Sequence, residues 1–136
     1  MRIYNVLNLT EKVGEMSTSE SEGQVIGCHT DATWNDLLQK AMDNKKLVVV
    51  DFTASWCGPC RFIAPFFAEL AKKFPQVMFL KVDIDELKSV ASDWAVEAMP
   101  TFIFLKEGKI LDTIVGAQKE ELQQTIAKHL NATTTA

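Results

Sequence analysis

The sequence predicts an α/β protein in which a mixed β-sheet is covered by helices on both faces. Two apolar runs rich in β-branched residues, 47–53 and 77–82, lie on either side of a helical pattern at 61–74. Two further apolar runs, 101–105 and 110–115, are joined by a short polar turn. A strand, a helix and a strand followed by a helix and a hairpin indicate layered α/β architecture.

The first half of the predicted domain begins with a helix over residues 33–44. Thr33 is its predicted cap, and Trp34 and Ala41 belong to an apolar stripe at helical spacing. Residues 47–53 read LVVVDFT, which predicts a strand buried on both faces. The helix predicted at 61–74 has a proline at position 65, where we expect a kink. Its predicted core side chains are Phe62, Ile63, Phe66, Leu70 and Phe74.

The second half completes the sheet and adds two helices. Residues 77–82 predict a second buried strand, and residues 85–95 predict a short helix. The runs 101–105 and 110–115 predict a hairpin whose turn is residues 106–109. The closing helix is predicted at 119–130, and its apolar face consists of Leu122, Ile126, Ala127 and Leu130.

Length and composition restrict the class of protein. The chain has 136 residues, 47% hydrophobic content and a net charge of −4, which suits one soluble domain. A mildly acidic chain with scattered charges does not have the basic patch expected of a protein that binds nucleic acid or membrane surfaces. No apolar run approaches the roughly 20 residues that span a bilayer. Three cysteines are too few for a secreted fold held by disulfides.

The two ends of the chain differ from its middle. Residues 1–22 carry several glutamates and serines without an apolar period, so we expect a flexible leader there. Its composition does not fit a signal or transit peptide, and Met16 is an alternative start. Residues 23–131 form the predicted domain. Residues 132–136 are expected to be a flexible tail.

One segment carries reactive chemistry, and it reads Trp56-Cys57-Gly58-Pro59-Cys60. It follows a predicted strand and precedes a predicted helix, so a cysteine lies where unpaired helical N–H groups favour a thiolate. Gly58 and Pro59 allow a tight turn, so the two sulfurs can close a small ring. Such a ring removes little entropy from the unfolded chain, so this disulfide is suited to reversible exchange. The strand-to-helix turn also places the first sulfur where another protein can reach it.

Other interpretations of these residue types stay open. Two cysteines with this spacing are also half of a zinc site, for which Cys28, His29 and His129 are the remaining candidate ligands. Cys28 alone suits a packed thiol, or else a glutathione adduct or an intermolecular disulfide. Neither histidine has a partner visible in the sequence, and both are expected to be surface residues instead of ligands. Trp34 and Trp94 are expected in or near the core.

The motifs together resemble thioredoxin. The segments that carry the likeness are VVVDFTAS, WCGPC, FIAPFFAELAKKF, FLKVDIDE, AMPTFIFLKEGK and VGA. EGQVIGCHT, DELKSVASDWAVEAMPTF and ELQQTIAKH are similar to the plant h-type, cytosolic branch. The likeness covers residues 22–130. It implies a central five-stranded mixed sheet flanked by four helices, and an activity that reduces disulfides in other proteins.

The resemblance implies unequal roles for the residues of the site. Cys57 matches the attacking cysteine and Cys60 the resolving one. Asp51 matches the buried acid behind the pair, whose raised pKa would let it accept the proton of Cys60. The alternative for Asp51 is a carboxylate in water at the strand end. Lys81 resembles the lysine that modulates this acid, and its alternative is an outward, solvated side chain.

The resemblance also implies a surface that binds clients. Pro100 matches a cis-proline opposite the disulfide, and a cis bond after Met99 would leave the backbone groups of Met99 free to pair with an extended substrate. An ordinary trans proline at the start of a strand is the alternative. Gly58 and Pro59 tune the redox equilibrium in this family, and Pro65 matches a helix-kinking proline. The apolar rim implied around the first sulfur consists of Trp56, Ala98, Met99, Val115, Gly116 and Ala117.

From this we expect a monomeric, cytoplasmic protein-disulfide reductase that takes part in electron transport and cell redox homeostasis. The chain has no glycine-rich nucleotide fingerprint, so electrons would come from NADPH through a separate thioredoxin reductase, with no bound cofactor. Two alternatives stay open. One is a disulfide oxidase or isomerase, although those usually carry histidine between the cysteines. The other is a holdase-like module that binds through the apolar rim without turnover.

Overall fold

The computed structural model describes residues 22–135, with side chains described as far as residue 131. Its elements follow the order β1 (Val25–Cys28), α2 (Asp31–Asp43), β2 (Val48–Thr53), α3 (Gly58–Lys73), β3 (Met78–Asp83), α4 (Lys88–Asp93), β4 (Thr101–Lys106), β5 (Lys109–Val115) and α5 (Lys119–Thr135). The predicted leader at 1–22 lies outside the described residues except for residue 22. The domain limits at 23 and 131 stay a prediction.

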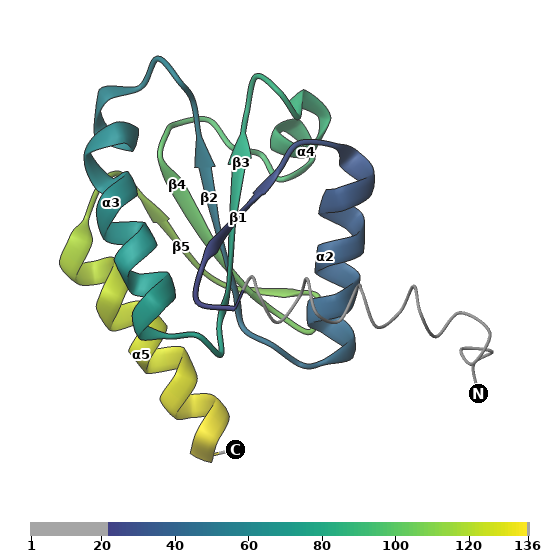
Figure 1. The fold of residues 1–136 in the computed structure, drawn as a ribbon, viewed down its shortest axis with the longest axis vertical. Helices are drawn as coiled ribbons and strands as arrows, with labels where there is room; N and C mark the ends of the chain where they lie inside the picture. Colours follow the sequence, from purple (N-terminus) through teal and green to yellow (C-terminus); the bar gives the residue numbers. More distant parts are fainter. Residues whose placement is uncertain (1–21, 136) are drawn as a thin grey trace.

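The five strands form one mixed sheet in the order β1-β3-β2-β4-β5 (Figure 1). Strands β1, β3 and β2 run parallel, whereas β4 is antiparallel to both β2 and β5. The five-stranded mixed sheet with four helices is therefore confirmed. Strand β2 is central, since β3 and β4 flank it.

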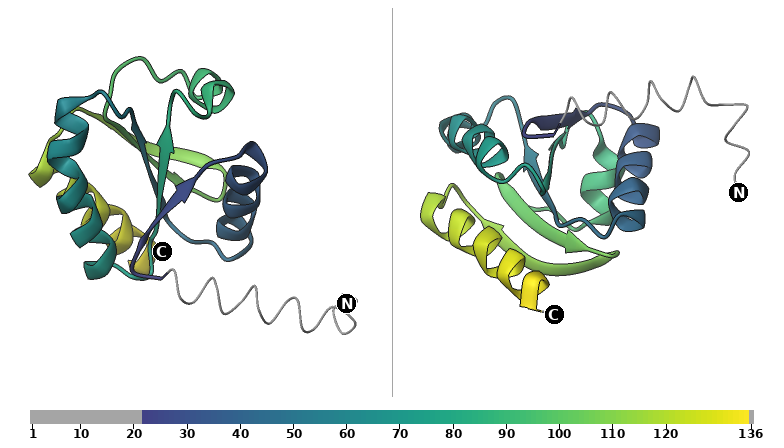
Figure 2. Two further views of the ribbon diagram at one scale, coloured as in Figure 1. Left: turned by 45° about the horizontal axis from the view of Figure 1, so that its top comes forward. Right: turned by 60° about the horizontal axis from the view of Figure 1, so that its bottom comes forward.

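Two helices cover each face of the sheet, as Figure 2 shows from two sides. Helices α2 and α4 pack on one face, where Trp34 and Val90 join Val50 and Phe52 of β2. Helices α3 and α5 pack on the other face, in a second core whose largest members are Phe67, Phe79, Phe102 and Phe104. Alternate residues of β2 enter different cores, as the period of two requires. All six residues of β2 are buried, which confirms the strand predicted to be buried on both faces.

The helices begin and end at other residues than the pattern predicts. The cap of α2 is Thr30, whose hydroxyl accepts the Thr33 N–H at 3.1 Å, so Thr33 lies inside the first turn. Helix α3 begins at Gly58, three residues before the predicted start, because Cys57 is its N-cap. Helix α4 is shorter than predicted. The backbone of α5 continues to Thr135, into the predicted tail, whose flexibility stays a prediction.

The prediction that Phe62 belongs to the core side of α3 is wrong. Its residue is 62% exposed, while Ile63 and Leu70 of the same helix are buried. The Lys119 ammonium lies 4.6 Å from the centre of the Phe62 ring, so a cation covers part of the aromatic face instead of other apolar side chains.

The hairpin turn and the tryptophan positions agree with the sequence. Glu107 and Gly108 both have positive φ, of 50° and 80°, which is the backbone of a two-residue type I′ turn. The rings of Trp34 and Trp94 meet edge to face, with centroids 6.0 Å apart. Trp34 is buried and Trp94 is half-buried, which confirms that both belong to the core or its border.

Candidate redox site

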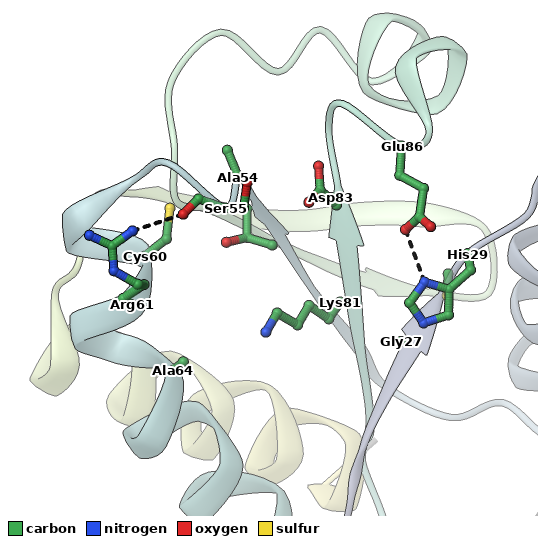
Figure 3. Close-up of a pocket in the computed structure, with 12 residues that line it drawn as sticks. Gly27, His29, Ala54, Ser55, Cys60, Arg61, Ala64, Lys81, Asp83 and Glu86 are labelled. Atoms are coloured by element: carbon green, nitrogen blue, oxygen red, sulfur yellow. Dashed lines mark hydrogen bonds and ion pairs between the residues drawn. The ribbon is translucent and has the colours of Figure 1, made fainter.

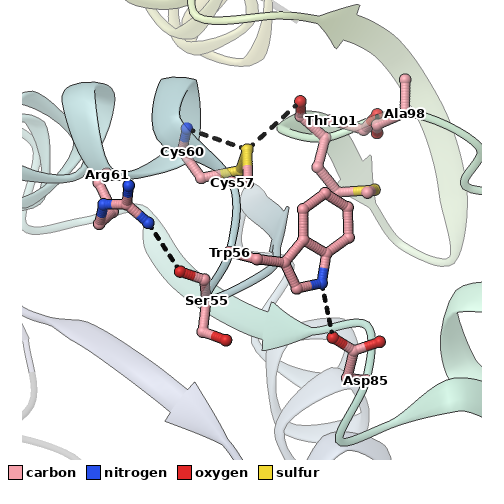
Figure 4. Close-up of a disulfide and its surroundings, with 9 residues drawn as sticks. Ser55, Trp56, Cys57, Cys60, Arg61, Asp85, Ala98 and Thr101 are labelled. Atoms are coloured by element: carbon pink, nitrogen blue, oxygen red, sulfur yellow. Dashed lines mark hydrogen bonds between the residues drawn. A yellow bond between two sulfur atoms is a disulfide. The ribbon is translucent and has the colours of Figure 1, made fainter.

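The two cysteines of the motif lie where β2 is connected to α3. The Sγ atoms of Cys57 and Cys60 are bonded as a disulfide, and their Cα atoms are 5.3 Å apart. Cys57 caps α3, since its Sγ accepts the N–H of Cys60 at 3.2 Å (Figure 4). The N–H of Cys57 donates to Ala54 O at 3.2 Å, which closes the loop after β2. The sulfur of Cys57 therefore accepts an N–H at the start of the helix, which favours its thiolate form once the disulfide is reduced.

The surroundings of the two sulfurs differ. Cys60 is 2% exposed and Cys57 is 5% exposed, whereas the adjoining Trp56 is 62% exposed. In the oxidised form both cysteines are therefore largely buried, and Cys57, the more exposed of the two, adjoins the exposed side chain of Trp56. The indole N–H of Trp56 donates to Asp85 Oδ2 at 2.9 Å, which fixes the ring beside the pair.

Asp51 is a buried carboxylate in the central strand. Its residue is 1% exposed, and its Oδ1 has no hydrogen-bond partner within the described part of the chain. Burial raises the pKa of Asp51 to about 7, and the positive charge of Lys81 acts in the opposite direction. The alternative of a carboxylate in water is thus wrong.

Lys81 lies beside Asp51 across the sheet, since the two residues are register partners of β3 and β2. Its residue is exposed, as the alternative interpretation held, yet its charge still lowers the pKa of Asp51. In Figure 3 the Lys81 side chain extends into a pocket towards α3. Lys81 is therefore exposed to solvent through the pocket and still influences the pKa of Asp51.

This pocket adjoins the resolving side of the motif. Its volume is about 550 Å³, and Cys60, Arg61 and Lys81 contribute to its wall. His29 Nδ1 and Glu86 Oε1 meet across its far side at 2.9 Å (Figure 3). The pocket therefore brings a space large enough for water close to Cys60.

The residues expected in the client-binding rim come from separate segments that meet near Cys57. The Met99–Pro100 peptide bond is cis, as the resemblance implies. The carbonyl oxygen of Met99 lies 3.6 Å from Cys57 Sγ, and the N–H of Gly116 donates to Pro100 O at 2.8 Å. Val115 is exposed at the end of β5. Ala98 is exposed, and Gly116 and Ala117 are half-buried.

The third cysteine and the histidines lie outside the disulfide, although Cys28 and His29 line the same pocket as Cys60. Cys28 is buried in the core under α2, and burial raises the pKa of its thiol to about 11, which favours the packed-thiol interpretation. Within the described residues no three His, Cys, Asp or Glu side chains gather as a metal site would need. The prediction of surface histidines is confirmed for the exposed His29, whereas His129 is half-buried. His29 meets Glu86, and the half-buried His129 meets Asp112 Oδ2 at 3.1 Å.

Two residues that sequence analysis did not single out contact the motif. Asp85 holds the Trp56 indole, and the Arg61 guanidinium donates to Ser55 O at 2.8 Å (Figure 4). The sequence contains no local signal for Asp85, which is 29 positions from its partner. Arg61 does have one, since a cation in the first turn of a helix opposes the usual charge preference.

A dithiol between a buried strand and a helix, on a five-stranded mixed sheet, defines a thiol–disulfide oxidoreductase. The family model "Thioredoxin" matches residues 25–128. Thioredoxin H1 of Arabidopsis thaliana is 78% identical over 112 residues, which cover 82% of this chain and 98% of that relative. Thioredoxin H-type 2 of Nicotiana tabacum is 76% identical over 115 residues, which cover 85% and 98%. The chain therefore belongs to the thioredoxin family, in its plant h-type group.

Solved structures agree with this assignment. The crystal structure of a poplar wild-type thioredoxin h superposes with a TM-score of 0.77 at 41% identity, covering 79% of this chain and 96% of that one. A thioredoxin from Nicotiana alata gives a TM-score of 0.76 at 43% identity, with 78% and 92% covered. The redox centre of this oxidoreductase is the Cys57–Cys60 pair. No helix of the described residues has the length and apolar character needed to cross a membrane.

Proposed function

We propose that the protein works as a disulfide reductase in which Cys57 attacks and Cys60 resolves. The Cys57 thiolate would attack one sulfur of a client disulfide, form a mixed disulfide and release the other client sulfur as a thiolate. Cys60 would then attack the Cys57 sulfur, releasing the second client thiol and closing the Cys57–Cys60 bond. Two electrons pass from the dithiol to the client in each cycle.

The single observation that carries this proposal is the unequal surroundings of the two sulfurs. Cys57 Sγ accepts a helical N–H and lies against the Met99 carbonyl, beside the exposed Trp56. Cys60 is the more buried of the two and lines the pocket that the Lys81 side chain enters. An outer thiolate suits attack on a client, and an inner thiol suits intramolecular release.

Asp51 is proposed as the proton acceptor for Cys60, and Lys81 as the residue that adjusts it. A carboxyl with a pKa of about 7 can accept and return a proton near neutral pH. The positive charge of Lys81 favours the ionised form that acts as a base. The Asp51→Ala variant tests this role, because it is expected to slow release of the mixed disulfide at neutral pH, and unchanged kinetics would refute it.

Clients are proposed to bind over the rim around Cys57. Trp56 and Val115 expose large apolar surfaces there, and Met99 presents backbone groups suited to an extended segment. Contact through apolar area and backbone requires little sequence selectivity in the client. Pro100, Gly116 and Ala117 would shape this surface, while Gly58 and Pro59 would tune the redox equilibrium of the pair.

The electrons are proposed to come from NADPH through a separate thioredoxin reductase, and the protein is proposed to act as a monomer in the cytoplasm. Plant h-type thioredoxins are its relatives at high identity, which supports this setting. Because the redox pair is the reactive group of the chain itself, exchange between proteins is sufficient to reload it.

The direct test is reduction of insulin with a thiol reductant. Cys57→Ser is expected to abolish turnover, and Cys60→Ser is expected to trap clients as mixed disulfides. Cys28→Ser is the matched control, since this buried cysteine is outside the disulfide, and the turnover of this variant is expected to persist. Failure of Cys60→Ser to trap any client would overturn the exchange mechanism.

The same assay separates the alternatives. An oxidase or isomerase would convert a reduced client to its disulfide form faster than it reduces insulin. A holdase-like module would suppress aggregation of insulin chains equally well with Cys57→Ser.

A further inference from the structure

Arg61 holds the loop before the redox pair at two points. Its backbone N–H donates to Cys57 O at 3.2 Å as the first hydrogen bond of α3. Its guanidinium Nη1 donates to Ser55 O at 2.8 Å, as Figure 4 shows. One residue of the helix therefore binds carbonyl groups on both sides of Trp56.

The position of Arg61 is electrostatically unusual. It follows Cys60 in the first turn of α3, where the helix already presents partial positive charge, and a cation there is unfavourable for the helix itself. A guanidinium at this place adds to the positive potential that Cys57 Sγ meets. The helix terminus and Arg61 thus favour the thiolate in the same direction.

The other charges near the loop come from three further segments. Asp51 belongs to β2, Lys81 and Asp83 to β3, and Asp85 to the loop that follows β3. Asp85 is bound to the Trp56 indole and, as a carboxylate, disfavours a thiolate on the adjoining residue. The Arg61 guanidinium is hydrogen-bonded to Ser55 in the loop before the redox pair, and its positive charge opposes the effect of the Asp85 carboxylate on the thiolate.

We propose that Arg61 is a positioning residue of the redox centre: its guanidinium fixes the loop through the Ser55 carbonyl and its charge favours the thiolate of Cys57. The proposal rests on the role of Cys57 as the attacking thiolate set out above.

The electrostatic part has a size that can be measured. A unit charge roughly one helical turn away, about 6–8 Å from the sulfur, changes a pKa by about half a pH unit in a water-like dielectric. This is about a threefold change in the thiolate fraction below the midpoint. Salt at 1 M reduces the Debye length to about 3 Å and is expected to remove most of the effect.

The experiment compares Arg61→Met, Arg61→Lys and the control Lys72→Met, which removes an exposed cation from the last turn of the same helix. Each substitution is made in a Cys60→Ser background, so that Cys57 is the accessible thiol and Cys28 stays buried. The first measurement is the pH profile of alkylation by iodoacetamide at low and high salt. The second is amide hydrogen exchange in residues 55–57.

Arg61→Met is expected to raise the alkylation midpoint by about half a pH unit at low salt and to speed exchange of the Cys57 amide. Arg61→Lys is expected to restore the midpoint but not the slow exchange, because its ammonium keeps the charge without the guanidinium geometry. A wild-type midpoint and wild-type exchange in Arg61→Met would overturn the proposal, as would an equal shift in Lys72→Met. Failure of the reductase mechanism would give a different result from failure of this proposal, since Cys57 would then be unreactive even with Arg61 intact.

Discussion

Replacing Asp51 by asparagine is expected to make the oxidised protein more stable at neutral and alkaline pH. Burial raises the pKa of this carboxyl to about 7, from an ordinary value of 3.8. The folded state therefore binds more protons than the unfolded state between about pH 4 and pH 7, and the free energy of unfolding falls as pH rises through that window. A difference of about 3 pH units corresponds to about 4 kcal/mol above pH 7.

The measurement is guanidinium unfolding of wild type and Asp51→Asn from pH 4 to pH 8, with the disulfide intact so that Cys57 and Cys60 do not titrate. The stability gain of the variant is expected to grow by about 4 kcal/mol over this range. Asp36→Asn, at an exposed position of α2, is the matched control and is expected to stay within about 0.5 kcal/mol of wild type. A gain from Asp51→Asn that does not change with pH would refute the reasoning.

Three further substitutions test the packing. Phe62→Ala is expected to cost under about 1 kcal/mol of unfolding free energy and Phe67→Ala about 3–5 kcal/mol, because only Phe67 is buried; equal losses in denaturant titrations would contradict this. His129 and Lys128 hold the pKa of Asp112 below its ordinary value, so Asp112→Asn is expected to lose under about 1 kcal/mol of unfolding free energy at pH 7 and less at acidic pH, where the carboxyl becomes protonated, measured by thermal unfolding at both pH values. Gly108→Ala, at φ 80°, is expected to lower stability by about 1 kcal/mol, and no change in the unfolding midpoint would be evidence against the type I′ turn.

The sequence predicts those elements whose local pattern matches their burial. Strand β2 is recognisable because both of its faces are covered, so its apolar run is nearly continuous. Asp51 lies within that run, and the apolar residues on both sides of it are the reason why its burial could be predicted. Strand β1 has only four residues with mixed burial, and Gly27 breaks the apolar pattern, so residue patterns alone did not define it.

One error arises from a local cap that the pattern does not show, and the others arise where a residue depends on distant partners. The early start of α3 depends on Cys57 as a cap, and Pro59 belongs to the first turn of the helix, where proline is favourable. Phe62 fits the helical stripe by its number alone, yet it lies on the side that Lys119 of α5 covers. His129 finds Asp112 only because α5 packs against β5. Periodicity within one segment contains no information on such pairings.

The central position of β2 in the sheet affects the order in which parts of the protein unfold. Backbone amides in a strand hydrogen-bonded on both sides open last, while outer strands such as β1 and β5 fray first. The reactive pair is attached directly to this most persistent part of the molecule. Turnover is therefore expected to continue at temperatures where the amides of β1, which is outside the proposed client-binding rim, already exchange.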